Sequence, residues 1–169
     1  MCLMDGSPLR WQPVGKTQGV PSEKSANITT MGFYNRQNIF FGYQLIGTSD
    51  SNLIIKCFDA FANEINQIKD PKKHTGGVPF IIIDNAPTHT SDAFLAKLKE
   101  WKLKNLFVQF IPAYCPELNR AANRYIEILW KHIKYHWMTI DAYKNIETLT
   151  LELDKILNQI GSKYRITFT

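Results

Sequence analysis

The sequence has few cysteines, and no pattern joins them. Cys2, Cys57 and Cys115 lie far apart, and their spacing fits neither a zinc site nor a disulfide framework. We therefore expect reduced cysteines with a structural role only, as is usual in a reducing compartment.

Long apolar runs are absent as well. The longest strongly apolar stretch, Val78 to Ile83, is far shorter than the roughly 20 residues that a membrane-spanning helix needs. Met1 is not followed by the basic, apolar and small-residue succession of a secretory signal. Internal repeats and low-complexity tracts are also missing. We therefore expect an intracellular protein without a membrane partner, whose residues 1–169 form a single domain.

The sequence does carry an excess of positive charge. It has 20 Lys and Arg residues against 15 Asp and Glu residues, which gives a formal net charge of +5. This excess favours a polyanionic partner such as nucleic acid, although many basic proteins bind none.

The succession of apolar patterns predicts an α/β fold. The expected strands are residues 2–5, Ile28 to Tyr34, Ile39 to Ile46, Val78 to Ile83 and Leu106 to Ile111. The expected helices start near Ser51, near Thr90 or Ser91, before Ile126, and at about Ala142, the last one ending at Gly161. A three-stranded meander followed by alternating helices and strands predicts a mixed sheet whose last two strands are parallel.

Several details of this prediction concern single residues. Val78 to Ile83 is apolar at successive positions, which is typical of a strand covered on both faces. Ser51 is the expected cap of the first helix. Pro112 and Pro116 bracket a segment that we expect to be a rigid loop, and the apolar stripe of the third helix reaches Trp137.

Acidic residues stand where such a sheet would bind a ligand. Asp5 and Asp84 end two expected strands, and open α/β sheets bind ligands at the carboxyl ends of their strands. Glu127 lies beside the apolar stripe of the third helix, where it can face those ends. Clustered carboxylates repel one another unless a cation joins them, and hard oxygen ligands suit Mg²⁺ or Mn²⁺. Each acid also has a simpler explanation, as a turn residue or an ordinary surface glutamate.

Three motifs occur in one order along the chain. They read IIIDNAPTH at residues 81–89, IPAYCPELN at 111–119 and IEILWK at 126–131. Together with MDG at 4–6 and WQPVG at 11–15, they resemble the signatures of mariner-related bacterial insertion-sequence transposases of the DDE superfamily of endonucleases. The resemblance covers nearly the whole chain. It implies an RNase H-like fold with a mixed five-stranded sheet, made of a three-strand antiparallel meander plus two parallel strands and flanked by helices.

The resemblance implies metal-dependent cleavage of DNA and strand transfer during transposition. It maps the catalytic and metal-binding carboxylates onto Asp5, Asp84 and Glu127, and implies two Mg²⁺ or Mn²⁺ ions as cofactors. The implied partners are transposon-end DNA, target DNA and a second copy of the chain in a homodimer. The implied location is the bacterial cytoplasm, in association with the nucleoid.

Other residues map around that site. Three polar residues would lie near it, although turn and cap hydrogen bonds explain them equally well: Asn85, His89 and Asn119. Four basic residues of the third motif region would meet DNA phosphates, although helix lysines and arginines are usually just solvated: Arg120, Arg124, Lys131 and Lys134.

Two departures from the family pattern leave alternatives open. Counting forward from Asn119 puts Ala122 in the place of the glutamate, whereas counting back from Trp130 puts Glu127 there after an insertion of five residues. We prefer Glu127, because the third motif stays intact and a short loop insertion costs little. Glu117 is a weaker substitute. The N-terminal helix-turn-helix region that normally reads the element ends is expected to be absent.

Two other functions therefore remain open. The first is a catalytically inactive or decayed transposase relative that acts as a DNA-binding or assembly module. The second is a different RNase H-like nuclease, against which the second and third motifs argue.

Overall fold

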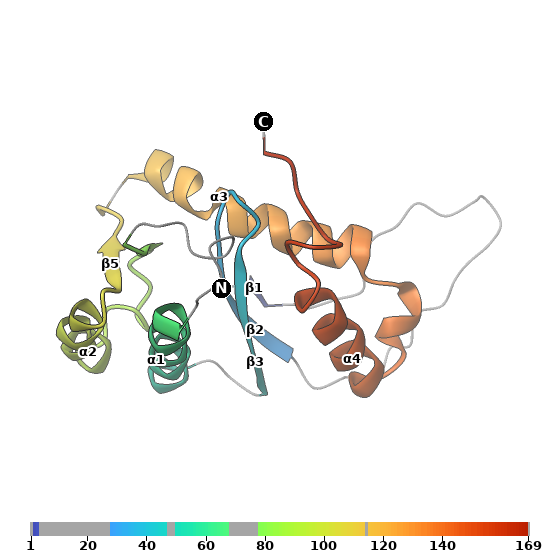
Figure 1. The fold of residues 1–169 in the computed structure, drawn as a ribbon, viewed down its shortest axis with the longest axis horizontal. Helices are drawn as coiled ribbons and strands as arrows, with labels where there is room; N and C mark the ends of the chain where they lie inside the picture. Colours follow the sequence, from blue (N-terminus) through green and yellow to red (C-terminus); the bar gives the residue numbers. More distant parts are fainter. Residues whose placement is uncertain (1, 4–27, 47–49, 68–77, 114, 169) are drawn as a thin grey trace. The chain divides into compact units, whose positions relative to one another are not determined.

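The computed structural model describes residues 2–3, 28–46, 50–67, 78–113 and 115–168 (Figure 1). The chain forms two compact units. The first unit comprises Met1–Gly47 and Tyr125–Thr169, and the second unit comprises Thr48–Arg124. Of the helices in the described parts, none combines the length and hydropathy needed to cross a bilayer.

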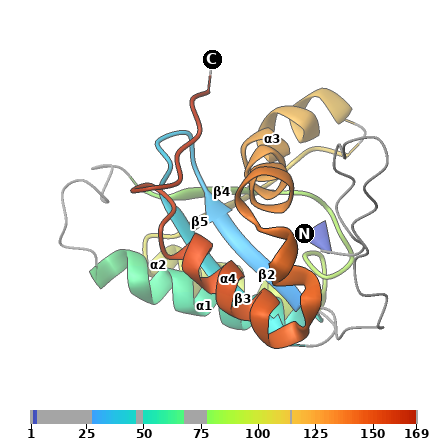
Figure 2. The same ribbon diagram turned by 90° about the vertical axis from the view of Figure 1, so that its right-hand side faces the viewer.

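An antiparallel meander organises the first unit. Strands β1 (Cys2–Leu3), β2 (Ile28–Tyr34) and β3 (Phe40–Ile46) are hydrogen-bonded in that order. Gly32 pairs with Gly42 at the centre of the β2–β3 hairpin, and the two strands run side by side in both views (Figures 1 and 2). The meander expected from the sequence is therefore confirmed.

Helices at the C-terminal end complete the core of the first unit. The third helix, α3 (Pro116–His132), continues into a π-helical turn, Ile133–Trp137, closed by a hydrogen bond from the Met138 amide to the Ile133 carbonyl. A 3₁₀-helix, Ile140–Lys144, and helix α4 (Ile146–Leu157) follow. The buried side chains of this core are Ile28, Leu129, Trp130, Ile133, Met138, Ala142, Leu153, Ile156 and Ile166.

Two predictions on these helices are wrong in detail. Pro116 does not close a rigid loop but starts α3, because a proline is tolerated in the first helical turn, where its missing N–H has no helical partner. The last helix does not run unbroken from Ala142 to Gly161. Asn145 interrupts it, since its side chain accepts a hydrogen bond from the Thr148 amide and so caps α4.

The second unit combines two helices with a parallel pair of strands. Its elements are α1 (Ser51–Gln67), β4 (Phe80–Ile83), α2 (Asp92–Leu103) and β5 (Phe107–Phe110). β4 and β5 pair in parallel, as expected from the sequence. Among the described strands these two form one sheet and the meander forms another, so the mixed α/β class is confirmed, whereas a single five-stranded sheet is not among the pairings.

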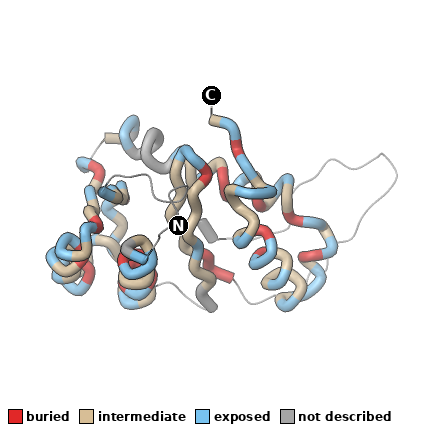
Figure 3. The backbone as a smooth tube through the Cα atoms, viewed as in Figure 1, coloured by how far each residue is buried: buried red, intermediate tan, exposed pale blue. Residues whose placement is uncertain are grey.

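Aromatic residues hold α1 and α2 together. Phe58 stacks on Trp101 with ring centroids 4.9 Å apart, and Phe94 meets Phe58 edge-on at 5.1 Å. All three side chains are fully buried. Both helices also carry exposed positions, as is typical of amphipathic helices (Figure 3). The cap of α1 is Asp50 rather than Ser51, because the Asp50 carboxylate accepts the Leu53 amide at 2.8 Å.

The prediction that β4 is covered on both faces is wrong. Val78, Phe80 and Ile82 are 53%, 66% and 53% exposed, whereas Ile83 is buried. Successive side chains of a strand point to opposite faces, so one face of β4 is packed and the other is open. The Phe80 ring is partly covered by Phe107 of β5, on which it stacks with ring centroids 5.2 Å apart.

Candidate functional site

Asp84 lies at the carboxyl end of the parallel strand pair. It follows Ile83, the last residue of β4, whose carbonyl accepts the Ile111 amide at 2.9 Å. The next residue, Asn85, donates its side-chain Nδ2 to the Ile111 carbonyl at 2.7 Å. The ends of β4 and β5 are thus tied together directly beside Asp84. The predicted placement of Asp84 at a strand end is confirmed.

A compact turn leads from Asp84 into α2. The Ala86 carbonyl accepts the backbone amides of His89 at 2.8 Å and Thr90 at 3.1 Å. Ser91 then caps α2 by accepting the Phe94 amide at 3.4 Å, so the predicted start of this helix is confirmed. Because the turn is closed at both ends, it holds the residues after β4 in one arrangement.

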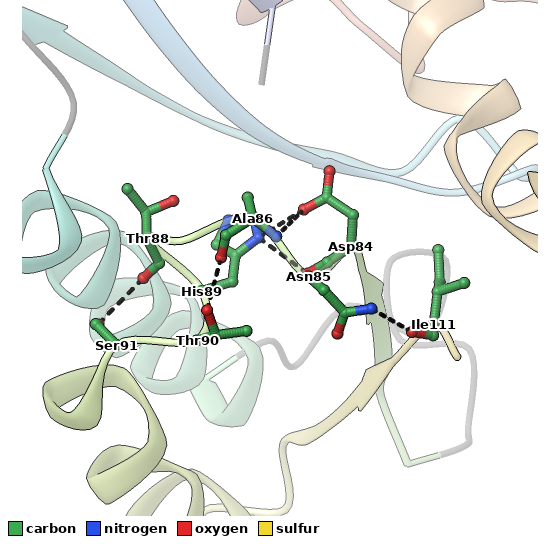
Figure 4. A network of polar contacts seen from close by, with 8 residues as sticks. All are labelled: Asp84, Asn85, Ala86, Thr88, His89, Thr90, Ser91 and Ile111. Atoms are coloured by element: carbon green, nitrogen blue, oxygen red, sulfur yellow. Dashed lines mark hydrogen bonds and ion pairs between the residues drawn. The ribbon is translucent and has the colours of Figure 1, made fainter. Parts of the chain in front are cut away.

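The two oxygens of the Asp84 carboxylate differ in their contacts with the described residues. Its Oδ1 accepts the Ala86 amide at 3.2 Å and lies 2.9 Å from His89 Nδ1. For Oδ2, the described part of the chain provides no hydrogen bond, and Figure 4 shows it pointing away from His89. The Asp84 side chain is 44% exposed. Asp84 is therefore a turn residue through Oδ1, and its Oδ2 is not engaged by any of the described residues.

The structure brings together only part of the predicted site. Asp84, Asn85 and His89 lie in one turn (Figure 4). Asp5 lies outside the described residues, and Glu127 lies on α3 in the first unit. Within the described chain, three or more His, Cys, Asp or Glu side chains do not gather into one cation site.

Glu127 itself is exposed. Among the described residues, none forms a hydrogen bond or an ion pair with its side chain. Arg124 and Lys131 on the same helix are exposed too, whereas Lys134 is half-buried with its Nζ 5.6 Å from the Tyr135 ring. Three further candidates lie within α3, but their side chains are outside the described set: Asn119, Arg120 and Ala122.

The last turn of α3 carries two basic residues, Lys131 and His132. Burial lowers the pKa of His132, and the neighbouring His136 and Lys131 lower it further.

Sequence reasoning missed the backbone groups of the site. The Ala86 amide donates to Asp84, and the Ile111 carbonyl accepts from Asn85. Every residue type has such a carbonyl and nearly every one has such an amide, so the sequence does not indicate these contacts. The direct contact between Asp84 and His89 was also missed. Its only signal in the sequence is the separation of five residues across a turn that contains Pro87.

Comparison with known proteins assigns this chain to a family. Residues 5–150 match the model of the DDE superfamily endonuclease family. No curated protein matches the chain. One similar solved structure is described as the crystal structure of a pre-cleavage Mos1 transpososome, with a TM-score of 0.58 and 15% identity over 90% of this chain.

That comparison covers 44% of the Mos1 chain, so this chain spans less than half of the protein to which it is similar. At this identity the likeness concerns the fold. Divalent metal ions are general cofactors of DDE superfamily endonucleases. The match over most of its length shows that the chain belongs to the DDE superfamily of endonucleases, as the motifs around Asp84 and Glu127 predicted.

Proposed function

We propose that this chain is a transposase catalytic domain, which cleaves DNA phosphodiester bonds with divalent metal ions and joins the ends by strand transfer. The family match over residues 5–150 carries the proposal, and the open carboxylate oxygen of Asp84 at the β4 end supports it. In this proposal the two units form one catalytic domain, and strands β1 to β5 form one five-stranded RNase H-like sheet.

The proposed metal ligands are Asp5, Asp84 and Glu127, which would hold two Mg²⁺ or Mn²⁺ ions. Asp84 fits this role because its Oδ2 is a hard oxygen donor that is not engaged by the described residues. Glu127 fits because it is exposed and unpaired within the described part of the chain. Ions bound there would supply activation of a water or 3′-hydroxyl and stabilisation of the leaving oxygen.

The proposed DNA contacts lie around Glu127 on α3. Residues three and four apart on a helix are surface neighbours, so Arg124 and Lys131 flank Glu127 on one face. Arg120 and Lys134 are further candidates along the same helix. Such cations would hold phosphates near the carboxylates, where cleavage takes place.

We propose DNA ends and target DNA as partners, and a homodimer as the assembly. The similar solved structure is described as a pre-cleavage Mos1 transpososome, which supports this proposal. Because the proposed substrate is DNA, we propose that this chain is located in the bacterial cytoplasm, in association with the nucleoid.

One observation favours an inactive relative as the second candidate. Helix α3 is continuous from Pro116 to His132, so the five extra residues before Glu127 do not lie in a loop. If Asn119 instead sets the register, Ala122 occupies the third acidic position. The chain would then bind DNA or assist assembly without cutting.

Titration with Mn²⁺ tests the proposed function. The 169-residue chain should bind Mn²⁺, and Asp84→Asn and Glu127→Gln should each weaken binding at least about 10-fold, since each removes a charged oxygen ligand. Asp141→Asn is the matched control, because Asp141 is exposed and pairs with Lys144 at 2.8 Å. Binding that is equal in all four proteins would overturn the site.

DNA cleavage separates the two candidates. A labelled duplex incubated with the chain and Mn²⁺ should be nicked by the wild type and not by Asp84→Asn. Duplex binding by the wild type without nicking, unchanged in Glu127→Gln, would favour the inactive module.

A further inference from the structure

We propose that His89 is a positioning residue that holds the Asp84 carboxylate through one oxygen, so that the other oxygen faces the metal. This inference rests on the proposed function. His89 would touch neither metal nor DNA, and would act only through Asp84.

The hydrogen bond between the two side chains has a defined direction. His89 Nδ1 lies 2.9 Å from Asp84 Oδ1 and 3.3 Å from the Asp84 backbone carbonyl oxygen. An ionised carboxylate and a carbonyl are both acceptors only, so the nitrogen between them must carry the hydrogen. His89 is therefore the donor, which fixes its tautomer through Nδ1.

The imidazole ring is itself held in place. The His89 side chain is 13% exposed, and its ring centroid lies 5.8 Å from that of Phe94, which is fully buried. The His89 backbone amide is bonded to the Ala86 carbonyl at 2.8 Å. The donor is thus held against the aromatic residues that join α1 and α2.

Two hydrogen-bond donors on Oδ1 determine which oxygen of Asp84 can bind a metal ion. The Ala86 amide and His89 together occupy Oδ1 and hold the carboxylate in one orientation, with Oδ2 directed away from the turn (Figure 4). A carboxylate oriented before the metal arrives loses less conformational freedom on binding. Asp84 is thereby prepared to bind through a single oxygen.

Two substitutions separate the hydrogen bond from the packing of the ring. His89→Phe keeps a ring against Phe94 but has no donor. His89→Asn loses the ring but can place an amide N–H close to the former position of Nδ1. If the donor matters, the dissociation constant for Mn²⁺ should rise about 10- to 100-fold in His89→Phe, and should stay within about threefold of wild type in His89→Asn.

Urea unfolding of both variants shows whether folding is affected. A purely structural ring would give the opposite order, with His89→Asn the less stable protein and the weaker metal binder. That order, or Mn²⁺ binding by His89→Phe equal to that of the wild type, would overturn the inference.

A second measurement requires no metal. The ¹⁵N chemical shifts of the His89 ring in the metal-free chain report which nitrogen is protonated. We expect a protonated Nδ1 in the wild type. The preference should be weaker in Asp84→Ala, which keeps the backbone carbonyl of residue 84 as an acceptor but loses the carboxylate. An unprotonated Nδ1 in the wild type would overturn the inference by itself. A protonated Nδ1 in a wild-type chain that binds no Mn²⁺ would instead refute the proposed function, and with it the purpose assigned to the contact.

Discussion

The side chain of Asn38 satisfies both backbone groups of Ile166. Its Nδ2 donates to the Ile166 carbonyl at 3.0 Å, and its Oδ1 accepts the Ile166 amide at 2.7 Å. Both residues are buried, and Tyr34 also donates its hydroxyl to Asn38 Oδ1 at 2.6 Å. One amide side chain thus fastens the β2–β3 hairpin to the C-terminal segment of the first unit.

Replacement of Asn38 should destabilise the first unit. Asn38→Ala removes three hydrogen bonds, two of them buried, and leaves the Ile166 groups unsatisfied, for which we expect a loss of about 2–4 kcal/mol in the free energy of unfolding. Asn38 also has a φ of 63°, which Asn and Gly tolerate better than Ala does. Urea denaturation measures the loss.

Asn105 provides the control for the backbone conformation. It has a φ of 59° but is exposed. Asn105→Gly should change stability by less than about 0.5 kcal/mol, whereas Asn38→Gly should remain strongly destabilising. Equal effects of the two glycine substitutions would mean that the side-chain bonds of Asn38 contribute nothing.

Ionisation of Cys57 should lower the free energy of unfolding at alkaline pH. Burial raises the pKa of the Cys57 thiol from 9.0 to about 11. In the unfolded chain the thiol ionises near its ordinary value, so above pH 9 the unfolded state binds fewer protons than the folded state. The free energy of unfolding should therefore fall between pH 9 and pH 11.

Unfolding of Cys57→Ala between pH 8 and pH 11 checks the assignment. The variant should be less stable than the wild type at pH 8, because a buried side chain is shortened. The difference in free energy of unfolding between the two proteins should become smaller as the pH rises from 9 to 11. A constant difference across the window would show that another group causes any alkaline loss.

The position of the third acid can be tested by moving it along α3. Positions 122 and 127 lie five residues apart on a continuous helix, which turns them about 140° from each other around the axis at about 100° per residue. A glutamate at 122 therefore cannot substitute for one at 127. The double variant Glu127→Ala, Ala122→Glu should bind Mn²⁺ as weakly as Glu127→Ala alone, and recovery of wild-type affinity would move the site to position 122.

Salt dependence should reveal phosphate contacts on α3. If Lys131 meets a phosphate, Lys131→Gln should weaken duplex binding and reduce the slope of log K against log salt by about 0.9. Lys155→Gln is the control, since Lys155 lies on α4 and pairs with Glu152. The same reduction in both variants would point to a general effect of charge instead of a contact.

Much of the fold could be predicted from periodicity. The bounds of β2 are those expected, and the start of α2 at Ser91 followed from its capping pattern. The errors have local causes. A proline reads as a loop signal, but at Pro116 it occupies the first helical turn. The apolar run of β4 does not reveal which of its faces is packed, because burial depends on elements far along the chain.

The site was predicted less completely than the fold. The position of Asp84 after β4 followed from the end of an apolar run, and the motif around it indicated the family. The bond from His89 depends on the path of the backbone between them, which no residue pattern specifies. Asp5 lies outside the described residues, and its role stays a prediction, as does that of Glu127.

The open face of β4 bears on how the second unit behaves when isolated. Val78, Phe80 and Ile82 are exposed, uncharged, β-forming residues on or next to β4, which pairs with β5 in the described part of the chain. An exposed apolar face of this kind favours hydrophobic association with other copies of the fragment. A fragment limited to residues 48–124 should therefore self-associate at high concentration, and a charged residue in place of Ile82 should suppress the aggregates.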